Sequence, residues 1–319
     1  MGKSEQENTN GAIPEDSAPR IGLALGSGAA RGWSHIGVIE SLARAGIHPH
    51  IICGTSIGAL VGAASLAGRM DGLRDWALNM SRGSMLRLLD FRMRGGGVVG
   101  GERIVGQLQS FIPDCTIAEL PAPYGAVATG LYSGNEMWLV EGPLISAVRA
   151  SISIPGIFTP VRHNGVWLVD GGVVNPVPVN LCRALGAQIV IAVNPNSVRG
   201  GRLVRPERQL LNKARPMGEQ TYALNGTEEE AANGGEGGAD TSAEKTPGIL
   251  EVMANSINIM QERIIRGRMA GDPPDALLNP RAGHIGLLEF HRAAEAIEAG
   301  EAAVRVMLPV LEEVLERQP

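Results

Sequence analysis

The sequence has few of the features that mark secreted, metal-binding or membrane-spanning proteins. Its three cysteines, at positions 53, 115 and 182, are an odd set without metal-ligand spacing, which excludes a disulfide framework and favours a reducing compartment. No uninterrupted apolar run reaches the roughly 18 residues that a membrane-spanning helix needs. The stretch before Ile21 has no apolar centre and so does not read as a signal peptide, and Gln6 breaks the myristoylation pattern. We therefore expect a cytoplasmic protein.

Charge of one sign is also scarce outside a single segment. The formal net charge is −5. Residues 226–246 account for all of this charge, because the segment contains six acidic residues and a single basic one, Lys245. The acidic residues are Glu228, Glu229, Glu230, Glu236, Asp240 and Glu244. The remainder is neutral, which gives no electrostatic reason to bind nucleic acid and none to avoid an anionic lipid surface. We predict no nucleic-acid partner.

What the chain does have is an alternation of short apolar strands with helices, beginning at Arg20. Such alternation is typical of an α/β layer built on a mainly parallel sheet. We expect a disordered tail over residues 1–19 and a catalytic domain over 20–196. A disordered, acidic, Gly/Glu-rich insertion should follow over 197–247, and a helical part that packs on the catalytic domain over 248–319.

The C-terminal part carries its own periodic patterns. Residues 249–268 have an amphipathic helix pattern, and residues 276–278 read as an edge strand. Residues 288–316 are again helical, with Pro309 expected to kink or break the helix. This last helix is predicted either to pack on the core or to form a homodimer face.

One turn in the N-terminal half is typical of a catalytic nucleophile. The apolar strand 51–53 runs into Gly54-Thr55-Ser56-Ile57-Gly58, and a helix of small residues follows. Glycines flank such a serine because a Cβ at either position would collide with the neighbouring strand or helix. The turn lifts the serine hydroxyl above the sheet at a helix N-terminus, where developing negative charge is favoured. The alternative is a close-packed turn whose serine only caps the helix.

A glycine-containing loop follows the first strand. It reads Gly26-Ser27-Gly28-Ala29-Ala30-Arg31-Gly32 and lacks both the dinucleotide-binding fingerprint and the Lys-Ser/Thr pair of a P-loop. We predict an anion-binding loop whose backbone N–H groups face the serine turn and form an oxyanion hole. Its candidate residues are Gly26, Gly28, Ala29, Arg31 and Gly32. Arg31 is expected to steady the loop or to meet a substrate phosphate, and the alternative is a surface ion pair.

A third element is Asp170-Gly171-Gly172 at the end of the apolar strand 166–169. Asp-Gly pairs are common in ordinary turns. Beside a serine turn and an oxyanion loop, however, a carboxylate in a partly desolvated crevice has a raised pKa and can take the serine proton as a general base.

These elements in this order resemble the patatin-like phospholipase family, in particular its small stand-alone bacterial members. Residues 25–37, Gly54–Gly58 and Asp170–Gly172 carry the resemblance, and residues 149–158 and 269–274 add to it. The resemblance implies a three-layer α/β/α fold and a Ser–Asp dyad, with Ser56 as the nucleophile and Asp170 as the proton acceptor. It also implies backbone donors around Gly28 and Ala29. No His or Cys cluster has metal-ligand spacing, so we predict no catalytic metal, and we expect no cofactor. The implied substrates are phospholipids, lysophospholipids or other fatty-acyl esters. This chain departs from the family in having Ser27 and Ala29 where glycines are common.

Two other functions fit the same residues. A Ser–His–Asp esterase of small soluble esters would recruit His284 or His291, both of which follow Asp170 in the chain as that triad order requires. His35 and His163 are expected to be structural hydrogen-bonding groups. A non-catalytic acyl- or phosphate-binding module with a regulatory role is the second alternative.

A short apolar and basic segment is the candidate for contact with lipid. Residues 85–94, from Met85 to Arg94, precede three glycines. Such a segment is typical of a lid, or of a piece that rests transiently on a phospholipid surface at the inner face of the membrane. The alternative is a core helix with solvated arginines.

Overall fold

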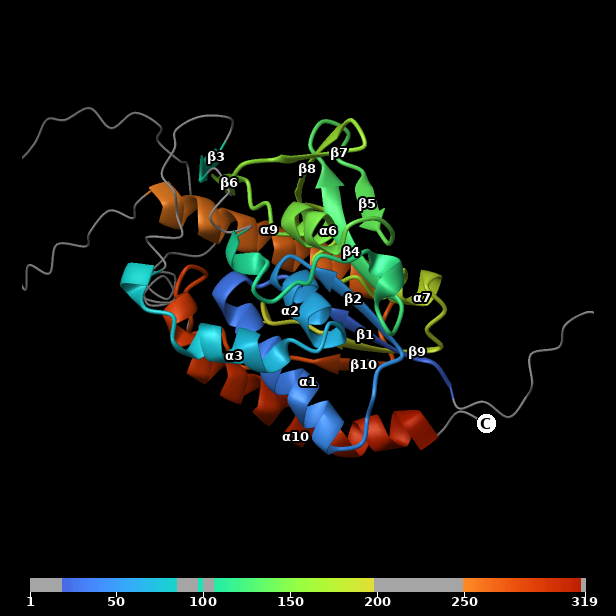
Figure 1. Cartoon of the computed structure of the whole chain (residues 1–319). Coiled ribbons are helices and arrows are strands. Elements are labelled where there is room, and N and C mark those ends of the chain that lie inside the picture. The colour runs from blue at the N-terminus through green and yellow to red at the C-terminus, as the bar shows by residue number, and fades with distance from the viewer. Residues whose placement is uncertain (1–18, 85–96, 100–105, 198–248, 317–319) are drawn as a thin grey trace, which may run out of the picture.

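The computed structural model describes residues 19–84, 97–99, 106–197 and 249–316 (Figure 1). The predicted tail 1–19 and the predicted insertion 197–247 lie outside the described residues, apart from positions 19 and 197. The candidate lipid-contact segment 85–94 also lies outside them. The predictions for these three segments therefore stay predictions.

An eight-stranded sheet forms the centre of the molecule. Its parallel part runs in the order β10 (Ala276–Leu278), β9 (Ile189–Val193), β1 (Ile21–Leu25), β2 (Ile51–Thr55) and β4 (Tyr124–Gly130). Both faces of these strands are covered, which explains why they read as continuous apolar runs. Strand β10 lies at the edge, as predicted.

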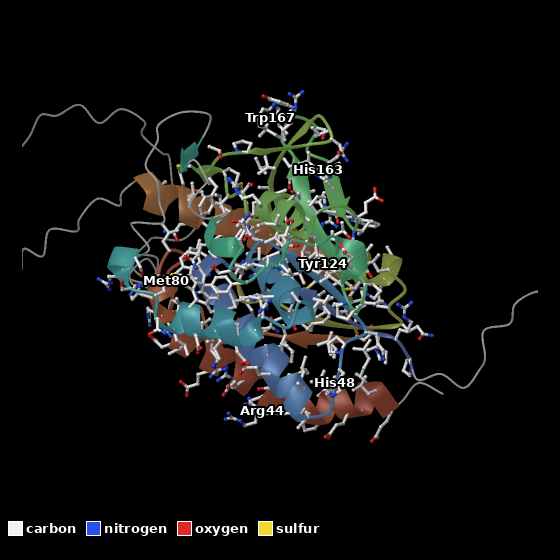
Figure 2. All side chains as sticks on the ribbon, viewed as in Figure 1. Arg44, His48, Met80, Tyr124, His163 and Trp167 are labelled. Atoms are coloured by element: carbon white, nitrogen blue, oxygen red, sulfur yellow. The ribbon has the colours of Figure 1, made fainter. Side chains whose placement is uncertain are left out.

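The remaining strands of this sheet are antiparallel. Strand β8 (Val166–Asp170) pairs with β4 and with β7 (Val161–His163), and β5 (Glu136–Leu139) also pairs with β4. A second, small sheet joins β3 (Gly97–Val99) to β6 (Gly156–Phe158). The sequence pattern missed β6 and β7, which have three residues each and, unlike the equally short β10, are mostly only partly buried. His163 and Trp167 lie in the β7–β8 hairpin, far from the buried Tyr124 at the centre (Figure 2).

The register of β4 decides which strand ends meet. Strand β2 pairs with the first half of β4, up to Thr55 opposite Val127. Strand β8 pairs with the second half, and its last residue, Asp170, lies opposite Ala128. Strand β5 pairs with residues from both halves and therefore occupies the other edge of β4. The carboxyl ends of β2 and β8 consequently approach each other head to head along one edge.

Helices cover both faces of the sheet. One face packs against α7 (Val179–Ala184) and α9 (Ile249–Gly271), whose apolar side chains join the core around Cys53 and Val190. The other face packs against α1 (Ser34–Arg44), α2 (Ile57–Leu66) and α10 (Ala293–Glu316). The shorter helices α3 (Met70–Leu78) and α6 (Leu144–Ser151) extend this second layer. The predicted three-layer α/β/α fold with a mainly parallel sheet is confirmed.

The C-terminal helix differs from its predicted bounds. A short 3-10 turn, Phe290–Arg292, precedes α10, and the helix then continues past Pro309 to Glu316. The helix is therefore not broken at Pro309, and the alternative expectation of a kink there stays a prediction. Leu311, fully buried against the sheet, holds the last turns in place, and this packing outweighs the hydrogen bond that a proline removes.

Candidate active site

Ser56 lies at a tight corner between β2 and α2. Its φ of 58° and ψ of −125° are strained for a residue with a side chain. The flanking glycines leave the space that the corner needs: a Cβ at Gly54 would meet the backbone of Ala59, and one at Gly58 would meet the carbonyl oxygen of Leu25. The reason given from the sequence for these two glycines therefore agrees with the observed packing.

Side chains from other elements hold this corner in place. The backbone N–H of Ser56 donates to Ser151 Oγ at 2.9 Å, and Ser151 Oγ donates to the carbonyl of Val127 at 2.6 Å. Thr55 Oγ1 donates to the carbonyl of Asn175 at 2.9 Å. Sequence reasoning missed Ser151. The available signal was a small hydroxyl residue at the last position of the segment 144–151.

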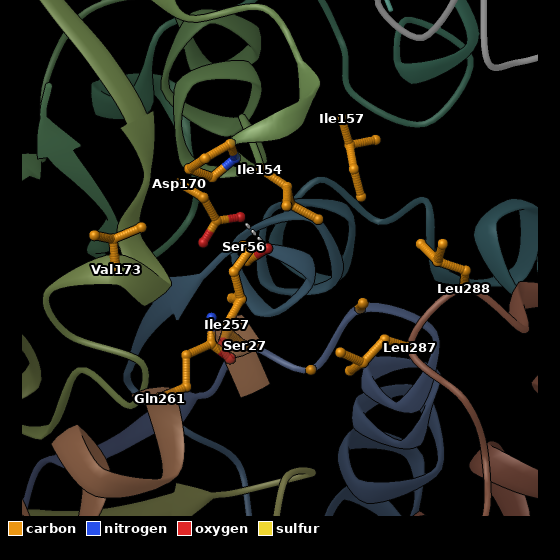
Figure 3. A pocket seen from close by; sticks show the side chains of 13 residues that line it. Ser27, Ser56, Ile154, Ile157, Asp170, Val173, Ile257, Gln261, Leu287 and Leu288 are labelled. Carbon is orange, nitrogen blue, oxygen red and sulfur yellow. Dashed lines mark hydrogen bonds between the residues drawn. The ribbon is translucent and has the colours of Figure 1, made fainter. Parts of the chain in front are cut away.

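The structure brings Ser56 and Asp170 into direct contact. Ser56 Oγ donates to Asp170 Oδ2 at 2.5 Å, although the two residues are 114 positions apart (Figure 3). Asp170 Oδ1 accepts the backbone N–H of Gly172 at 2.7 Å. The exposed fractions of Ser56 and Asp170 are only 4% and 2%. Thr129 Oγ1 donates to the Asp170 carbonyl at 2.8 Å and fixes the end of β8.

Burial changes the acidity of this carboxyl group. Loss of water around Asp170 raises its pKa to about 6, and the hydrogen bonds from Ser56 and Gly172 offset only part of that rise. A carboxylate with this pKa can accept a proton near neutral pH and give it back.

The glycine loop presents two backbone donors, the N–H groups of Gly28 and Ala29, beside Ser56. The neighbouring N–H groups are already bonded within the fold: that of Ser27 donates to Pro176 O at 2.8 Å, and that of Ala30 donates to Leu287 O at 3.0 Å. Among the described residues no acceptor is recorded for the N–H groups of Gly28 and Ala29. Ala29 has a φ of 47°, a conformation that favours glycine. Both residues border the space in front of Ser56, so their N–H groups are the candidate oxyanion donors.

The other predicted glycines of the site have no side chain, and this lets neighbouring strands, loops and helices pack closely together. A Cβ at Gly26 would lie 2.7 Å from the carbonyl oxygen of Val193. A Cβ at Gly32 would meet Ile57, and one at Gly171 would meet Val127 O. These glycines therefore let the loop, α2 and the end of β8 pack against the same strands.

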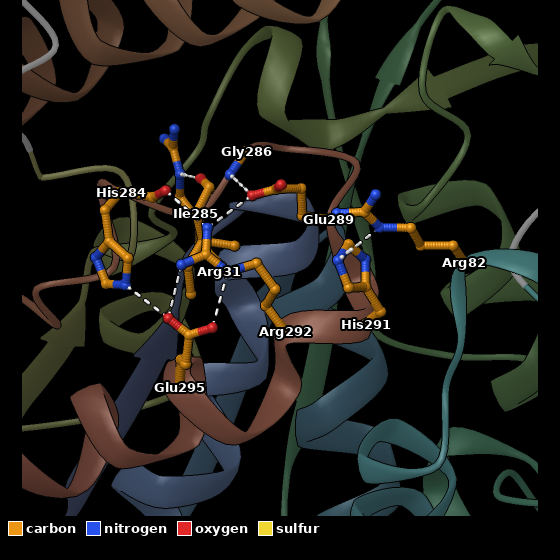
Figure 4. Close-up of polar contacts among 9 residues, drawn as sticks. All are labelled: Arg31, Arg82, His284, Ile285, Gly286, Glu289, His291, Arg292 and Glu295. Carbon is orange, nitrogen blue, oxygen red and sulfur yellow. Dashed lines mark hydrogen bonds and ion pairs between the residues drawn. The ribbon is translucent and has the colours of Figure 1, made fainter.

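Arg31 is buried, with an exposed fraction of 3%. Its Nε donates to Ile285 O at 2.7 Å (Figure 4), and its Nη1 donates to Asn258 Oδ1 at 3.2 Å and to Asn196 Oδ1 at 3.4 Å. No carboxylate within the described ranges pairs with it, so the surface ion pair considered from the sequence is wrong. Burial lowers the pKa of this guanidinium. Arg31 steadies the loop by tying it to the C-terminal segment.

The histidines lie away from the Ser56 hydroxyl. The exposed His284 has its Nε2 3.2 Å from Glu295 Oε2, and the half-buried His291 accepts at Nε2 from Arg82 Nε at 3.2 Å (Figure 4). His35 is buried and its Nε2 donates to Gly26 O at 2.7 Å, as a structural group would. None of the six histidines borders the two pockets next to Ser56.

Two apolar pockets meet at Ser56, and they differ in their polar groups. The first, of about 470 Å³, includes Asp170, Ser27 and Gln261 (Figure 3). The second, of about 640 Å³, does not include Asp170, and its wall is aromatic and aliphatic: Trp33, Leu60, Trp76, Met80, Leu108 and Phe290. Trp33 makes edge contacts with the rings of Trp76 and Phe290, at centroid distances of 5.7 and 6.0 Å.

Within the part of the chain that the structure describes, no group of three or more His, Cys, Asp and Glu side chains is arranged to hold a metal ion. No helix in these described ranges is long and apolar enough to cross a membrane.

The chain is similar to known proteins over most of its length. The sequence model of the patatin-like phospholipase family matches residues 23–183. An uncharacterized NTE family protein of Mycobacterium tuberculosis is 34% identical, over 93% of this chain and 93% of that protein. A second uncharacterized NTE family protein of the same organism is 29% identical, over 93% of this chain and 48% of that protein.

A mammalian relative is similar over a shorter stretch. Patatin-like phospholipase domain-containing protein 7 of Rattus norvegicus is 34% identical, over 56% of this chain and 14% of that protein. The family match and the similarity along nearly the whole chain agree with the serine corner, the glycine loop and the aspartate described above. The chain belongs to the patatin-like phospholipase family, a family of lipid hydrolases.

Proposed function

We propose that this protein is a serine hydrolase of fatty-acyl esters, of the phospholipase A or lysophospholipase type, with a Ser56–Asp170 dyad. The observation that carries the proposal is the hydrogen bond from Ser56 Oγ to Asp170 Oδ2, at the junction of two apolar pockets. A buried, strained serine in contact with a carboxylate of raised pKa is costly for a fold and is typical of a catalytic centre.

The first half of the reaction follows from this geometry. Asp170 takes the hydroxyl proton while Ser56 Oγ attacks the ester carbonyl carbon. The carbonyl oxygen becomes negative and is held by the N–H groups of Gly28 and Ala29, aided by the N-terminal end of α2. Asp170 then gives its proton to the departing alkoxide, and an acyl-serine is left.

The second half uses the same groups in reverse. Asp170, ionised again, takes a proton from a water molecule that attacks the acyl-serine carbonyl. The fatty acid is released, and the proton returns to Ser56 Oγ. The pocket bordered by Trp33, Trp76 and Phe290 suits the acyl chain, because its lining is almost entirely apolar.

The placement of the histidines supports the dyad over a triad. Neither His284 nor His291 borders the pockets, and both are hydrogen-bonded to residues outside them. A cytoplasmic location, contact of residues 85–94 with a membrane surface, and a homodimer stay predictions.

A fluorophosphonate probe tests the proposal directly. Such a probe phosphonylates an activated serine, so we expect mass spectrometry of the treated protein to find the adduct on Ser56. Ser56→Ala should carry no adduct, and Asp170→Asn should react far more slowly. A folded wild-type protein that takes up no label would contradict the hydrolase and favour the non-catalytic binding module.

The pH dependence of hydrolysis is a second test. Because the base must be ionised, kcat/KM for an uncharged ester should rise about tenfold per pH unit below the Asp170 pKa. The rise should level off above that pKa, which is about 6. The measurement is kcat/KM for a soluble p-nitrophenyl ester from pH 4 to 8. A rate that is flat over this range would rule out Asp170 as the base.

A further inference from the structure

The path of the proton assigns different parts of the substrate to the two pockets. In the proposed reaction the departing alkoxide takes its proton from Asp170, so the alcohol must leave on the side of that carboxyl group. Asp170 borders the first pocket and not the second. We therefore call the first the alcohol pocket and the second the acyl pocket.

Gln261 supplies an amide to the alcohol pocket, and it comes from α9, beyond the residues 23–183 that the family model matches. The exposed fraction of the residue is 9%. A buried amide is costly unless its polar atoms find partners. Either the amide oxygen Oε1 or the amide nitrogen Nε2 of Gln261 can face the substrate.

Neighbouring hydrogen bonds settle the orientation of this amide. Asn196 Nδ2 donates to the backbone carbonyl of Ser27 at 3.2 Å, and a carbonyl can only accept. The same Nδ2 lies 3.1 Å from the Gln261 side chain, which must therefore present its oxygen there. Ser27 Oγ donates to that oxygen as well, at 3.0 Å. Gln261 Oε1 is thus satisfied, and the Nε2 group is left on the other side.

The Nε2 group lies beside the dyad carboxylate. Three atoms surround one point, the position that a Cβ on Gly172 would take. Gln261 Nε2 is the atom nearest to that point, Asp170 Oδ1 lies 2.9 Å from it, and Ser27 Oγ lies 3.1 Å from it. Within the described ranges Nε2 has no recorded acceptor, and Figure 3 shows it pointing up from α9 toward Ser56 and Asp170. A free donor next to the group that protonates the alkoxide is positioned to bind the alcohol part of the substrate.

We propose that Gln261 determines specificity for the alcohol part of the ester. Its Nε2 donates a hydrogen bond to an oxygen on the carbon next to the ester-bearing carbon, as glycerol provides and a simple alkyl alcohol does not. This inference rests on the proposed hydrolase function. The donor is neutral and no charged side chain other than Asp170 is found in the described lining of this pocket, so the oxygen it binds is a hydroxyl or ester oxygen of glycerol.

Paired substrates test this assignment. The wild-type protein should hydrolyse a 1-monoacylglycerol with a higher kcat/KM than the propyl ester of the same fatty acid. Gln261→Met fills the same volume without the donor, and it should lower kcat/KM for the glyceryl ester on the order of tenfold while leaving the propyl ester nearly unchanged. The loss should appear mainly as a higher KM, because the contact also exists in the bound ground state.

Two further variants separate this role from a structural one. Gln261→Glu keeps an oxygen toward Ser27 and Asn196 but replaces the N–H donor by a carboxylate oxygen, which also adds a charge beside Asp170. Because the added charge acts on both esters, the variant is judged by the ratio of the two, which should lose the preference for the glyceryl ester. Asn258→Leu lies one turn earlier on α9, is equally buried and belongs to the same network, but does not border the alcohol pocket. Whatever it costs in activity, it should leave the ratio of the two esters unchanged.

The outcomes are distinct. An equal loss on both esters in Gln261→Met and Gln261→Glu, with labelling of Ser56 by the fluorophosphonate intact, would overturn the assignment and leave the hydrolase standing. No labelling of the wild type would overturn both. A preference for the glyceryl ester that survives in Gln261→Met would also overturn the assignment.

Discussion

Asp170→Asn is expected to lower kcat about 10⁴-fold and, at the same time, to stabilise the folded protein above pH 7. Activity falls because an amide cannot accept the proton of Ser56. Stability rises because the wild-type carboxylate is charged and buried. Its pKa is about 6 in the fold against an ordinary value of 3.8, which corresponds to a cost on the order of 3 kcal/mol in the folded state at pH 8.

The sign of this effect depends on pH in a defined way. Because the folded-state pKa of Asp170 is raised, the native protein holds a proton between about pH 4 and pH 6 that the unfolded chain has lost. The contribution of Asp170 to the free energy of unfolding is therefore fully present below pH 4 and is lost as the pH rises through 6. The advantage of Asp170→Asn should be present at pH 8 and absent at pH 4.

Thermal unfolding at the two pH values, together with steady-state kinetics at pH 8, measures both effects. Ser56→Ala is the matched control: it should lose activity equally, but it removes a hydrogen bond from the buried carboxylate and should lower the melting temperature at pH 8. An Asp170→Asn protein less stable than the wild type at pH 8 would contradict the assigned pKa. Retained hydrolysis would contradict its role as the base.

Gly300→Ala is expected to destabilise the fold by about 3 kcal/mol. Gly300 is buried on α10, where that helix crosses α1, and a Cβ there would meet the carbonyl oxygen of Ser34. A Cβ at Gly37, on the facing helix, would meet the carbonyl oxygen of Ile297 in the same way. Backbone atoms cannot rotate aside as a side chain does, so the two helices would have to separate.

Gly267→Ala provides the matched comparison. Gly267 also lies inside a helix, α9, but it is exposed and nothing lies within 4 Å of the position of its Cβ. Alanine should stabilise the protein there by up to about 1 kcal/mol through its better helix propensity. Thermal unfolding of both variants followed by circular dichroism should show shifts of opposite sign. Two shifts of the same sign would mean that close helix contact does not explain Gly300.

Locally encoded features of this protein were predictable because adjacent residues determine them. The glycines at 54 and 58 predicted a tight corner around Ser56, since only residues without a side chain fit there. The alternation of apolar strands with helices predicted the layered α/β fold. The motif order predicted the family. Local patterns did not decide between a kink and a break at Pro309, where the helix continues, and they missed the strands β6 and β7, which are short and only partly buried.

Only the tertiary structure decided which distant groups meet. Thr55 and Asp170 pair with consecutive residues of β4, and this register, rather than any local pattern, places Ser56 Oγ against the carboxylate. Burial then sets the Asp170 pKa, and α9 brings in Gln261, 234 positions after the Ser27 hydroxyl that it binds. The sequence by itself determined the turn, the loop and the candidate acid, because backbone geometry is a property of neighbouring residues. Contacts, burial and acidity depend on residues far apart in the chain, and only the folded arrangement defines them.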